Sequence, residues 1–203
     1  MTVYTYPIGP LLTNCYVVTC PSAKGDALVI DPAFGKEKIL AFLESKGLRL
    51  AGVVLTHCHF DHMSAVDGLC EGGVPLYCPK NDAPALKDSK RNASFYFGRP
   101  LEVRTVPARL LFEGDEITIG EESLRVLETP GHTAGSICLL GEDLLFSGDT
   151  LFCRGYGRTD LPTGSEASLA ASLRRILSLE ERTVYPGHGE KTTIFEEKTY
   201  FGF

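Results

Sequence analysis

Three histidines and one aspartate stand within six positions of this sequence, directly after an apolar segment. The residues are His57, His59, Asp61 and His62, and the apolar segment is 53–56. A buried strand that ends at this point would group these side chains on a loop held by a rigid scaffold. Imidazole nitrogens and carboxylate oxygens are ligands for zinc, iron or manganese. The spacing therefore predicts a metal-binding loop.

The two remaining histidines and another aspartate follow predicted strands in the same manner. His132 stands in the motif Pro-Gly-His-Thr, and His188 stands in the motif Pro-Gly-His-Gly. Asp149 stands in the motif Ser-Gly-Asp-Thr. All five histidines of the chain thus lie where a strand passes into a loop. Scattered structural histidines would rarely fall this way.

These seven donors are too many for one tetrahedral metal ion but suit two. Two groups of three ligands that share a bridging carboxylate would hold two ions roughly 3.5–4 Å apart, with a water molecule between them. Such ions bring the pKa of water from about 15.7 toward about 7 and polarise a carbonyl group. We therefore predict metal-assisted hydrolysis. The alternative is a metal-binding protein without catalysis, which would fill every metal position with a protein ligand.

Composition and charge argue against several other classes of function. The chain has 203 residues, for which we expect one domain spanning 1–203 with a sizeable core. Its formal net charge of −6 argues against nucleic acid as a partner. We expect no membrane span, because no run of about 18 apolar residues exists, and we see no signal-peptide pattern. Seven cysteines without a C-x-x-C pair suggest the cytoplasm. We expect a small-molecule substrate and a monomer or homodimer.

The pattern of apolar residues predicts many strands and few helices. Two packed sheets covered by helices fit this order best. In the first half we expect strands at 2–6, 12–19, 26–31, 50–56 and 76–78, with helices at 36–46 and 64–70. In the second half we expect strands at 102–106, 116–119, 123–128, 136–141, 144–147 and 183–185, with helices at 165–178 and 193–200.

The motifs that carry the histidines and Asp149 together resemble those of the metallo-β-lactamase superfamily, in the same order and over the whole chain. The resemblance implies an α+β fold, an αββα four-layer sandwich of two mixed sheets flanked by helices, with the site at one edge of the sheets. It implies two divalent metal ions per chain, zinc first, with iron or manganese as alternatives. It also implies Asp61 and Asp149 as catalytic residues. The implied ligands are His57, His59 and His132 for one metal and Asp61, His62 and His188 for the other, with Asp149 bridging.

Two further segments restrict the resemblance to one subfamily of these proteins. Segments 4–18 and 151–162 resemble the short, single-domain glyoxalase II-like hydrolases, which are hydroxyacylglutathione hydrolase-like proteins. Those proteins cleave a thioester to a hydroxy acid and a thiol, so the resemblance implies a small thioester as substrate. Two alternatives share the motifs. One is a persulfide dioxygenase with a single iron on His57, His132 and Asp149, and the other is a lactonase.

Three residues that follow Asp149 closely are candidates for substrate binding. Arg154, Tyr156 and Arg158 could reach an anionic substrate from this position. The alternative for Arg158 is an ion pair with Asp160 that braces the loop.

Three other features are interpreted as structural. Cys58 would face away from the neighbouring histidines in an extended segment, so we do not expect it to be a metal ligand. Asp31 ends a predicted strand and is interpreted as a turn residue or a supporting carboxylate. The aromatic residues at 95–97 are predicted to be core or pocket wall.

Overall fold

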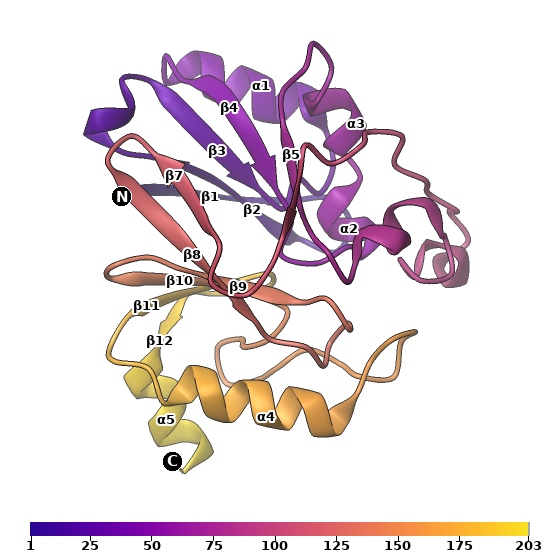
Figure 1. The fold of residues 1–203 in the computed structure, drawn as a ribbon, viewed down its shortest axis with the longest axis vertical. Coiled ribbons are helices and arrows are strands. Elements are labelled where there is room, and N and C mark those ends of the chain that lie inside the picture. Colours follow the sequence, from indigo (N-terminus) through magenta and orange to yellow (C-terminus); the bar gives the residue numbers. More distant parts are fainter. Residues whose placement is uncertain (203) are drawn as a thin grey trace.

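Apolar segments of the first half of the chain build one six-stranded mixed sheet. In the computed structural model, which describes residues 1–202, these strands lie side by side in chain order (Figure 1). β1, β2 and β3 pair antiparallel, whereas β3 to β6 pair parallel. The strands are β1 (Thr2–Ile8), β2 (Thr13–Thr19), β3 (Asp26–Ile30), β4 (Arg49–Val54), β5 (Leu76–Pro79) and β6 (Arg109–Leu111).

The second half of the chain builds another six-stranded mixed sheet, which packs against the first. Its strands also neighbour one another in chain order, and all pairs are antiparallel except β10 with β11. The strands are β7 (Glu116–Ile119), β8 (Glu122–Glu128), β9 (Ile137–Leu140), β10 (Leu144–Gly148), β11 (Thr183–Pro186) and β12 (Thr192–Thr193).

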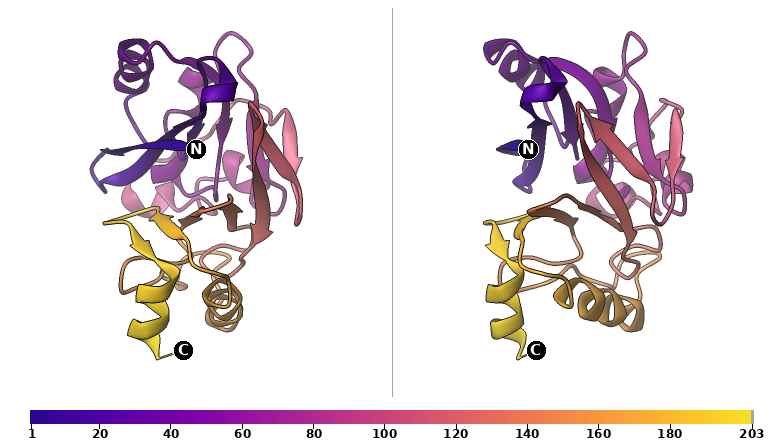
Figure 2. Two further views of the ribbon diagram at one scale, coloured as in Figure 1. Left: turned by 90° about the vertical axis from the view of Figure 1, so that its left-hand side faces the viewer. Right: turned by 60° about the vertical axis from the view of Figure 1, so that its left-hand side comes forward.

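Helices cover the outer face of each sheet, so the predicted αββα sandwich of two mixed sheets is confirmed. The views in Figures 1 and 2 show α1 and α3 on the first sheet and α4 and α5 on the second. The α-helices are α1 (Lys36–Ser45), α2 (Phe60–Met63), α3 (Val66–Leu69), α4 (Glu166–Leu177) and α5 (Ile194–Phe201). Three 3-10 helices are η1 (Pro21–Ala23), η2 (Ala83–Lys87) and η3 (Ser94–Phe97). The predicted domain 1–203 also includes Phe203, which lies outside the described residues.

Neighbouring residues on one strand belong to different apolar layers. Val17 of β2 packs into the layer under α1 and α3, whereas Val18 packs between the two sheets. In the second sheet, Leu145 of β10 packs toward α4 and α5, and Phe146 packs between the sheets. Successive side chains of a strand point to opposite faces. Both faces of these strands are buried, which explains their continuous apolar sequences.

The strand predicted at 102–106 is wrong, because the strand lies at Arg109–Leu111. The segment 102–106 is rich in β-branched residues, which favour a strand. Its backbone N–H groups are satisfied elsewhere, however, since the carboxylate of Asp67 accepts from the N–H groups of Arg104 and Thr105. The N–H of Val103 donates to the carbonyl of Leu86. The helix predicted at 64–70 is present but shorter, as α3 (Val66–Leu69), and the separate short helix α2 (Phe60–Met63) precedes it.

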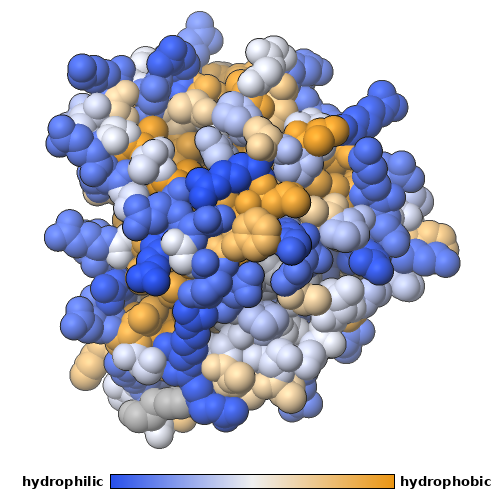
Figure 3. All heavy atoms as spheres, in the orientation of Figure 1, coloured by the Kyte–Doolittle hydropathy of each residue, from blue (hydrophilic) through white to orange (hydrophobic). Residues whose placement is uncertain are grey.

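Polar and charged side chains cover most of the face shown in Figure 3, with apolar side chains gathered in small groups between them. Within residues 1–202, no helix has the length and apolar character needed to cross a membrane.

Candidate metal centre

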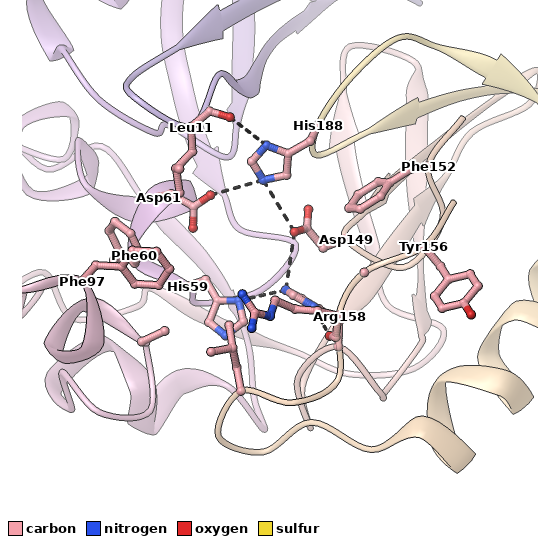
Figure 4. Close-up of a pocket in the computed structure, with 14 residues that line it drawn as sticks. Leu11, His59, Phe60, Asp61, Phe97, Asp149, Phe152, Tyr156, Arg158 and His188 are labelled. Atoms are coloured by element: carbon pink, nitrogen blue, oxygen red, sulfur yellow. Dashed lines mark hydrogen bonds and ion pairs between the residues drawn. The ribbon is translucent and has the colours of Figure 1, made fainter. Parts of the chain in front are cut away.

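The seven predicted donors come from four strand exits and meet at one end of the paired sheets. The loop after β4 carries His57 and His59, and the short helix α2 carries Asp61 and His62. The second sheet supplies the other three from the loops that follow β8, β10 and β11. Figure 4 shows Asp61, Asp149 and His188 pointing toward one another across the cavity. The three from the second sheet are His132, Asp149 and His188.

Ligand atoms of these residues form three overlapping groups, and within each group all atoms lie within 4.8 Å of one another. Two groups coincide with the two predicted ligand sets, and the third places Asp149 between the sets. Asp149 Oδ2 lies 3.5 Å from His132 Nε2 and 3.6 Å from His188 Nε2. Its carboxylate therefore reaches both sets, as a bridging ligand must. The groups are His57, His59 and His132; Asp61, His62 and His188; and His57, His62 and Asp149.

Hydrogen bonds on the far side of three rings orient them toward the centre. The Nδ1 of His62 lies 3.0 Å from Asp31 Oδ2, and the Nδ1 of His132 lies 2.7 Å from the carbonyl oxygen of Arg158. The Nδ1 of His188 lies 3.2 Å from the carbonyl oxygen of Leu11. A ring that donates through Nδ1 keeps the lone pair on Nε2 free. In all three rings, Nε2 points toward the other donors.

Several polar atoms at the centre are buried without a hydrogen-bond partner. Among the described residues they are the Nε2 atoms of His57 and His59 and the Oδ1 atom of Asp149. In addition, His59 Nδ1 and His132 Nε2 face each other at 2.8 Å. A buried polar atom without a partner costs free energy, so such atoms need an explanation. A cation bound between them would supply it, and the donor set fits divalent metal ions.

Burial keeps two of the rings neutral. Desolvation lowers the pKa of His57 well below its ordinary value and lowers the pKa of His59 to about 3. Both imidazoles are therefore uncharged at neutral pH, which is the form that binds a metal ion.

Nearby carboxylates favour the protonated, positively charged form of two other rings, His62 and His188. Burial lowers the pKa of His62, but the nearby carboxylates of Asp149, Asp61 and Asp31 raise it by more. Burial also lowers the pKa of His188, but the hydrogen bond with Asp61 and the negative charges of Asp149 and Asp61 together raise it by more. Burial raises the pKa of Asp149, but His62, His132 and His57 together lower it by more, so it lies well below its ordinary value. Metal cations would satisfy the same carboxylates in place of these protons.

A residue that sequence reasoning missed holds Asp61 in place. The hydroxyl of Thr13, at the start of β2, donates to Asp61 Oδ2 at 3.0 Å. The next residue, Asn14, donates from its side chain to the carbonyl oxygens of Pro186 and Gly189, which flank His188. The resemblance of segment 4–18 to glyoxalase II-like proteins drew attention to this turn, but nothing in it indicated contact with the donors.

The prediction that Asp31 is a supporting carboxylate agrees with the structure. Asp31 accepts from the backbone N–H and the hydroxyl of Thr56 at 2.8 and 2.7 Å, in addition to its contact with His62. Asp31 thus links the end of β3 to both the metal-binding loop and α2.

Cys58 belongs to none of the three donor groups, as expected, and its sulfur packs 3.5 Å from that of Cys78.

A cavity of about 450 Å³ opens over the donors. Tyr156 and Arg158 line it, as predicted, but Arg154 does not. The backbone N–H of Arg154 donates to Glu197, and its side chain lines a separate hollow beside α5. Arg158 pairs with Asp160 through two contacts of 2.6 Å, in agreement with the alternative interpretation. The apolar lining consists of Leu11, Phe60, Ala93, Phe97, Phe152, Gly157 and Leu161.

The aromatic residues at 95–97 are not core. Phe95, Tyr96 and Phe97 are 50%, 58% and 48% exposed. Phe97 forms part of the cavity wall, where its ring lies 5.0 Å from that of Phe60. The other two rings pack on each other outside the cavity.

Comparison with known proteins agrees with this arrangement. Residues 8–188 match the metallo-beta-lactamase superfamily. The probable metallo-hydrolase YqgX of Bacillus subtilis is 38% identical, over 95% of this chain and 92% of its own length. The hydroxyacylglutathione hydrolase GloC of Haemophilus influenzae is 31% identical, over 98% of this chain and 95% of its own length.

Two solved structures are similar over nearly their whole length. The BLEG-1 B3 metallo-beta-lactamase is 36% identical with a TM-score of 0.92, and the match covers 98% of this chain and 97% of that one. TTHA1623 in a di-iron-bound form is 37% identical with a TM-score of 0.86, and the match covers 96% of each chain.

Proposed function

This chain belongs to the metallo-beta-lactamase superfamily, and from that premise we propose that it is a dinuclear metal-dependent hydrolase of small thioesters. The observation that carries the proposal is the convergence of seven donors, in overlapping groups, at the floor of one cavity. Two divalent ions bound there supply Lewis acidity, which acidifies water and polarises a carbonyl group. The di-iron form of TTHA1623 supports iron beside zinc as a candidate metal.

Each donor has a defined task in this proposal. Asp149 lies between the two ligand sets, and its ionised carboxylate would offset the charge of both ions. Asp61 is held by Thr13, so its carboxylate would meet the second ion from a fixed position. The first ion would be held by His57, His59 and His132, and the second by Asp61, His62 and His188, with Asp149 bridging.

The cavity walls favour a substrate with an apolar part next to the reacting carbonyl. Phe60 and Phe97 form one wall and Phe152 forms the opposite one (Figure 4). Apolar walls exclude water from the donors, which strengthens electrostatic interactions inside the site. Among the described residues that line this cavity, Arg158 is the one arginine or lysine, and it already forms an ion pair with Asp160. The similarity to GloC, which bears the name of a thioester hydrolase, supports a thioester as substrate.

Hydrolysis of S-lactoylglutathione by zinc-loaded protein tests the proposal. We expect loss of thioester absorbance together with release of free thiol, and elemental analysis should give nearly two metal ions per chain. Apo-protein prepared with a chelator is the matched control, and added zinc should restore its activity.

Three results would redirect the assignment. Two bound metals with no hydrolysis of any thioester in a panel of acyl groups and thiols would overturn the thioesterase proposal. Ring opening of lactones without thioester cleavage would identify a lactonase. One iron per chain, with oxygen uptake on glutathione persulfide, would identify a dioxygenase.

A further inference from the structure

Asp82 is a buried carboxylate that belongs to none of the donor groups. It lies in the turn between β5 and η2 and is 4% exposed. Burial of a carboxylate is costly unless hydrogen bonds replace the lost water. The neighbours of Asp82 therefore show why the fold keeps a carboxylate at this position.

The hydrogen bonds of Asp82 come from both sheets. Its Oδ2 accepts from the backbone N–H of Cys58 at 2.9 Å and from the hydroxyl of Thr133 at 2.8 Å. Its Oδ1 accepts from the backbone N–H of Gly135 at 2.9 Å. Cys58 is on the loop after β4 in the first sheet, whereas the other two donors are on the loop between β8 and β9 in the second.

These contacts connect the residues that flank one predicted ligand set. Cys58 lies between His57 and His59 in the chain, and Thr133 directly follows His132. A shift of Asp82 would therefore change the position of His132 relative to the other two rings. Asp82 and Gly135 are packed closely together: a Cβ atom added to Gly135 would lie only 2.6 Å from Asp82 Oδ1, so there is no room for a larger residue.

The second ligand set is held by different residues. Thr13 donates to Asp61, Asp31 contacts His62, and the carbonyl of Leu11 accepts from His188. In the part of the chain that the structure describes, Asp82 has no hydrogen bond to this second set, although Asp31 also accepts from Thr56, which directly precedes His57 of the first set.

We propose that Asp82 is a positioning residue that sets the geometry of the three-histidine group, His57, His59 and His132, by joining its two loops across the two sheets. The inference rests on the metal-binding part of the proposed function and does not depend on the thioester substrate. Residues that support metal ligands in this way change metal affinity by about 10- to 100-fold when they are replaced.

The test measures zinc affinity, by competition with a chromophoric chelator, in two backgrounds. His188→Ala leaves the three-histidine group complete, and His59→Ala leaves the other group complete. Asparagine at position 82 keeps one acceptor oxygen but turns an NH₂ group toward an N–H donor. We expect Asp82→Asn to weaken zinc binding about 10- to 100-fold in the His188→Ala background, and to change it less than about twofold in the His59→Ala background. Thr13→Val should show the reverse pattern.

Thr133→Val is the second variant, in case Asp82→Asn does not fold. It removes one of the three bonds and should weaken zinc binding several-fold in the His188→Ala background alone. Thr192→Val is the matched control, because it removes a hydroxyl bond of 2.7 Å to the buried carboxylate of Glu197, away from the donors.

Equal loss of zinc affinity in both backgrounds would show that Asp82 has only a general structural role and would overturn the proposal. Unchanged affinity in the His188→Ala background would overturn it as well. Failure of the wild-type protein to bind two zinc ions would instead overturn the dinuclear centre on which the proposed function depends.

Discussion

The floor and the rim of the cavity differ in how tightly their side chains are held. At the floor, six of the seven donors are buried, and His188 is partly exposed. Hydrogen bonds constrain four of the donors: Thr13 donates to Asp61, whereas Asp31 and the carbonyls of Arg158 and Leu11 accept from the three rings of His62, His132 and His188. Their orientation therefore does not depend on a ligand.

At the rim, the side chains are more exposed and have fewer polar contacts. Tyr156 is 55% exposed and Phe97 is 48% exposed. The ion pair between Arg158 and Asp160 lies in solvent, where such pairs contribute little. These side chains can change rotamer or partner at low cost.

The difference indicates that the floor determines the chemistry and the rim adjusts the choice of substrate. Substitutions at the floor should therefore change metal binding and turnover, whereas substitutions at the rim should change KM.

Replacement of the carboxylate between the two ligand sets should have the largest effect. We expect Asp149→Ala to lower thioester hydrolysis at least about a thousandfold and to lower the metal content below two ions per chain. Circular dichroism should show an unchanged fold. Asp143→Ala, in the exposed turn before β10, is the control and should retain activity. Wild-type turnover by the Asp149 variant would contradict the assignment of the floor.

Loss of a support behind the floor should have the next largest effect. Asp31→Asn should lower metal affinity about 10- to 100-fold, because a neutral amide holds the His62 ring less well. Asn tolerates the positive φ of +51° at this position, so the variant changes the charge with little backbone strain. Chelator competition measures the affinity, and Asp26→Asn, at the other end of β3, is the control. Equal affinities in the two variants would mean that Asp31 does not support the metal site.

The metal-free protein should lose stability as the pH rises above about 7.5. The folded-state pKa values of His62 and His188 are raised, so the stability that they contribute is complete below the unfolded pKa of about 6.5 and is lost as the pH rises through the folded pKa. The pKa values of His57 and His59 are lowered, so these two rings oppose that loss near pH 6.5, where the unfolded rings still lose protons. About one unit higher, both rings are neutral in both states and add little slope.

Thermal unfolding of chelator-treated protein between about pH 7.5 and 9 measures this effect, and we expect Tm to fall by a few degrees. Bound zinc displaces these protons, so the zinc-loaded protein should show a smaller slope. A Tm of metal-free protein that rises across this range would contradict the predicted protonation of His62.

Truncation of a rim side chain should change substrate binding without changing turnover. We expect Phe97→Ala to raise KM about fivefold, the effect of roughly 1 kcal/mol of lost apolar contact, at constant kcat. Phe95→Ala is a matched control, because Phe95 has a similar exposure but does not line the cavity. A large fall in kcat for Phe97→Ala would place this ring in the catalytic machinery instead.

The smallest effect should come from the exposed ion pair at the rim. Asp160→Asn should leave Tm unchanged within the error of the measurement, because water screens the pair with Arg158. The pKa of Asp160 is lowered to about 2 by its hydrogen bond with Arg158, but the group is fully exposed. A clear drop in Tm would show that the pair braces the loop over the cavity.

Much of the fold and most of the donor set could be predicted because their signals are local. The apolar runs before His57 and Asp149 belong to strands that are buried on both faces, and they end at the predicted donors. The error at 102–106 arose because Asp67, which is distant in the chain, supplies the partners that a sheet would otherwise supply. The sequence could not show that Arg154 lies outside the cavity lining, because its position depends on a turn with a φ of +57° and on a hydrogen bond from its backbone N–H to Glu197.

Local sequence is enough to identify the chemical groups and to show that each group follows a strand, since neighbouring residues mark the end of a strand. The groups that hold the rings in place, in contrast, are brought to them only by the packing of the two sheets. Leu11 and His188 are 177 positions apart, and Asp82 reaches Thr133 across 51 positions. Such contacts form only when two sheets pack together, and a single buried carboxylate or carbonyl leaves no pattern in the neighbouring sequence.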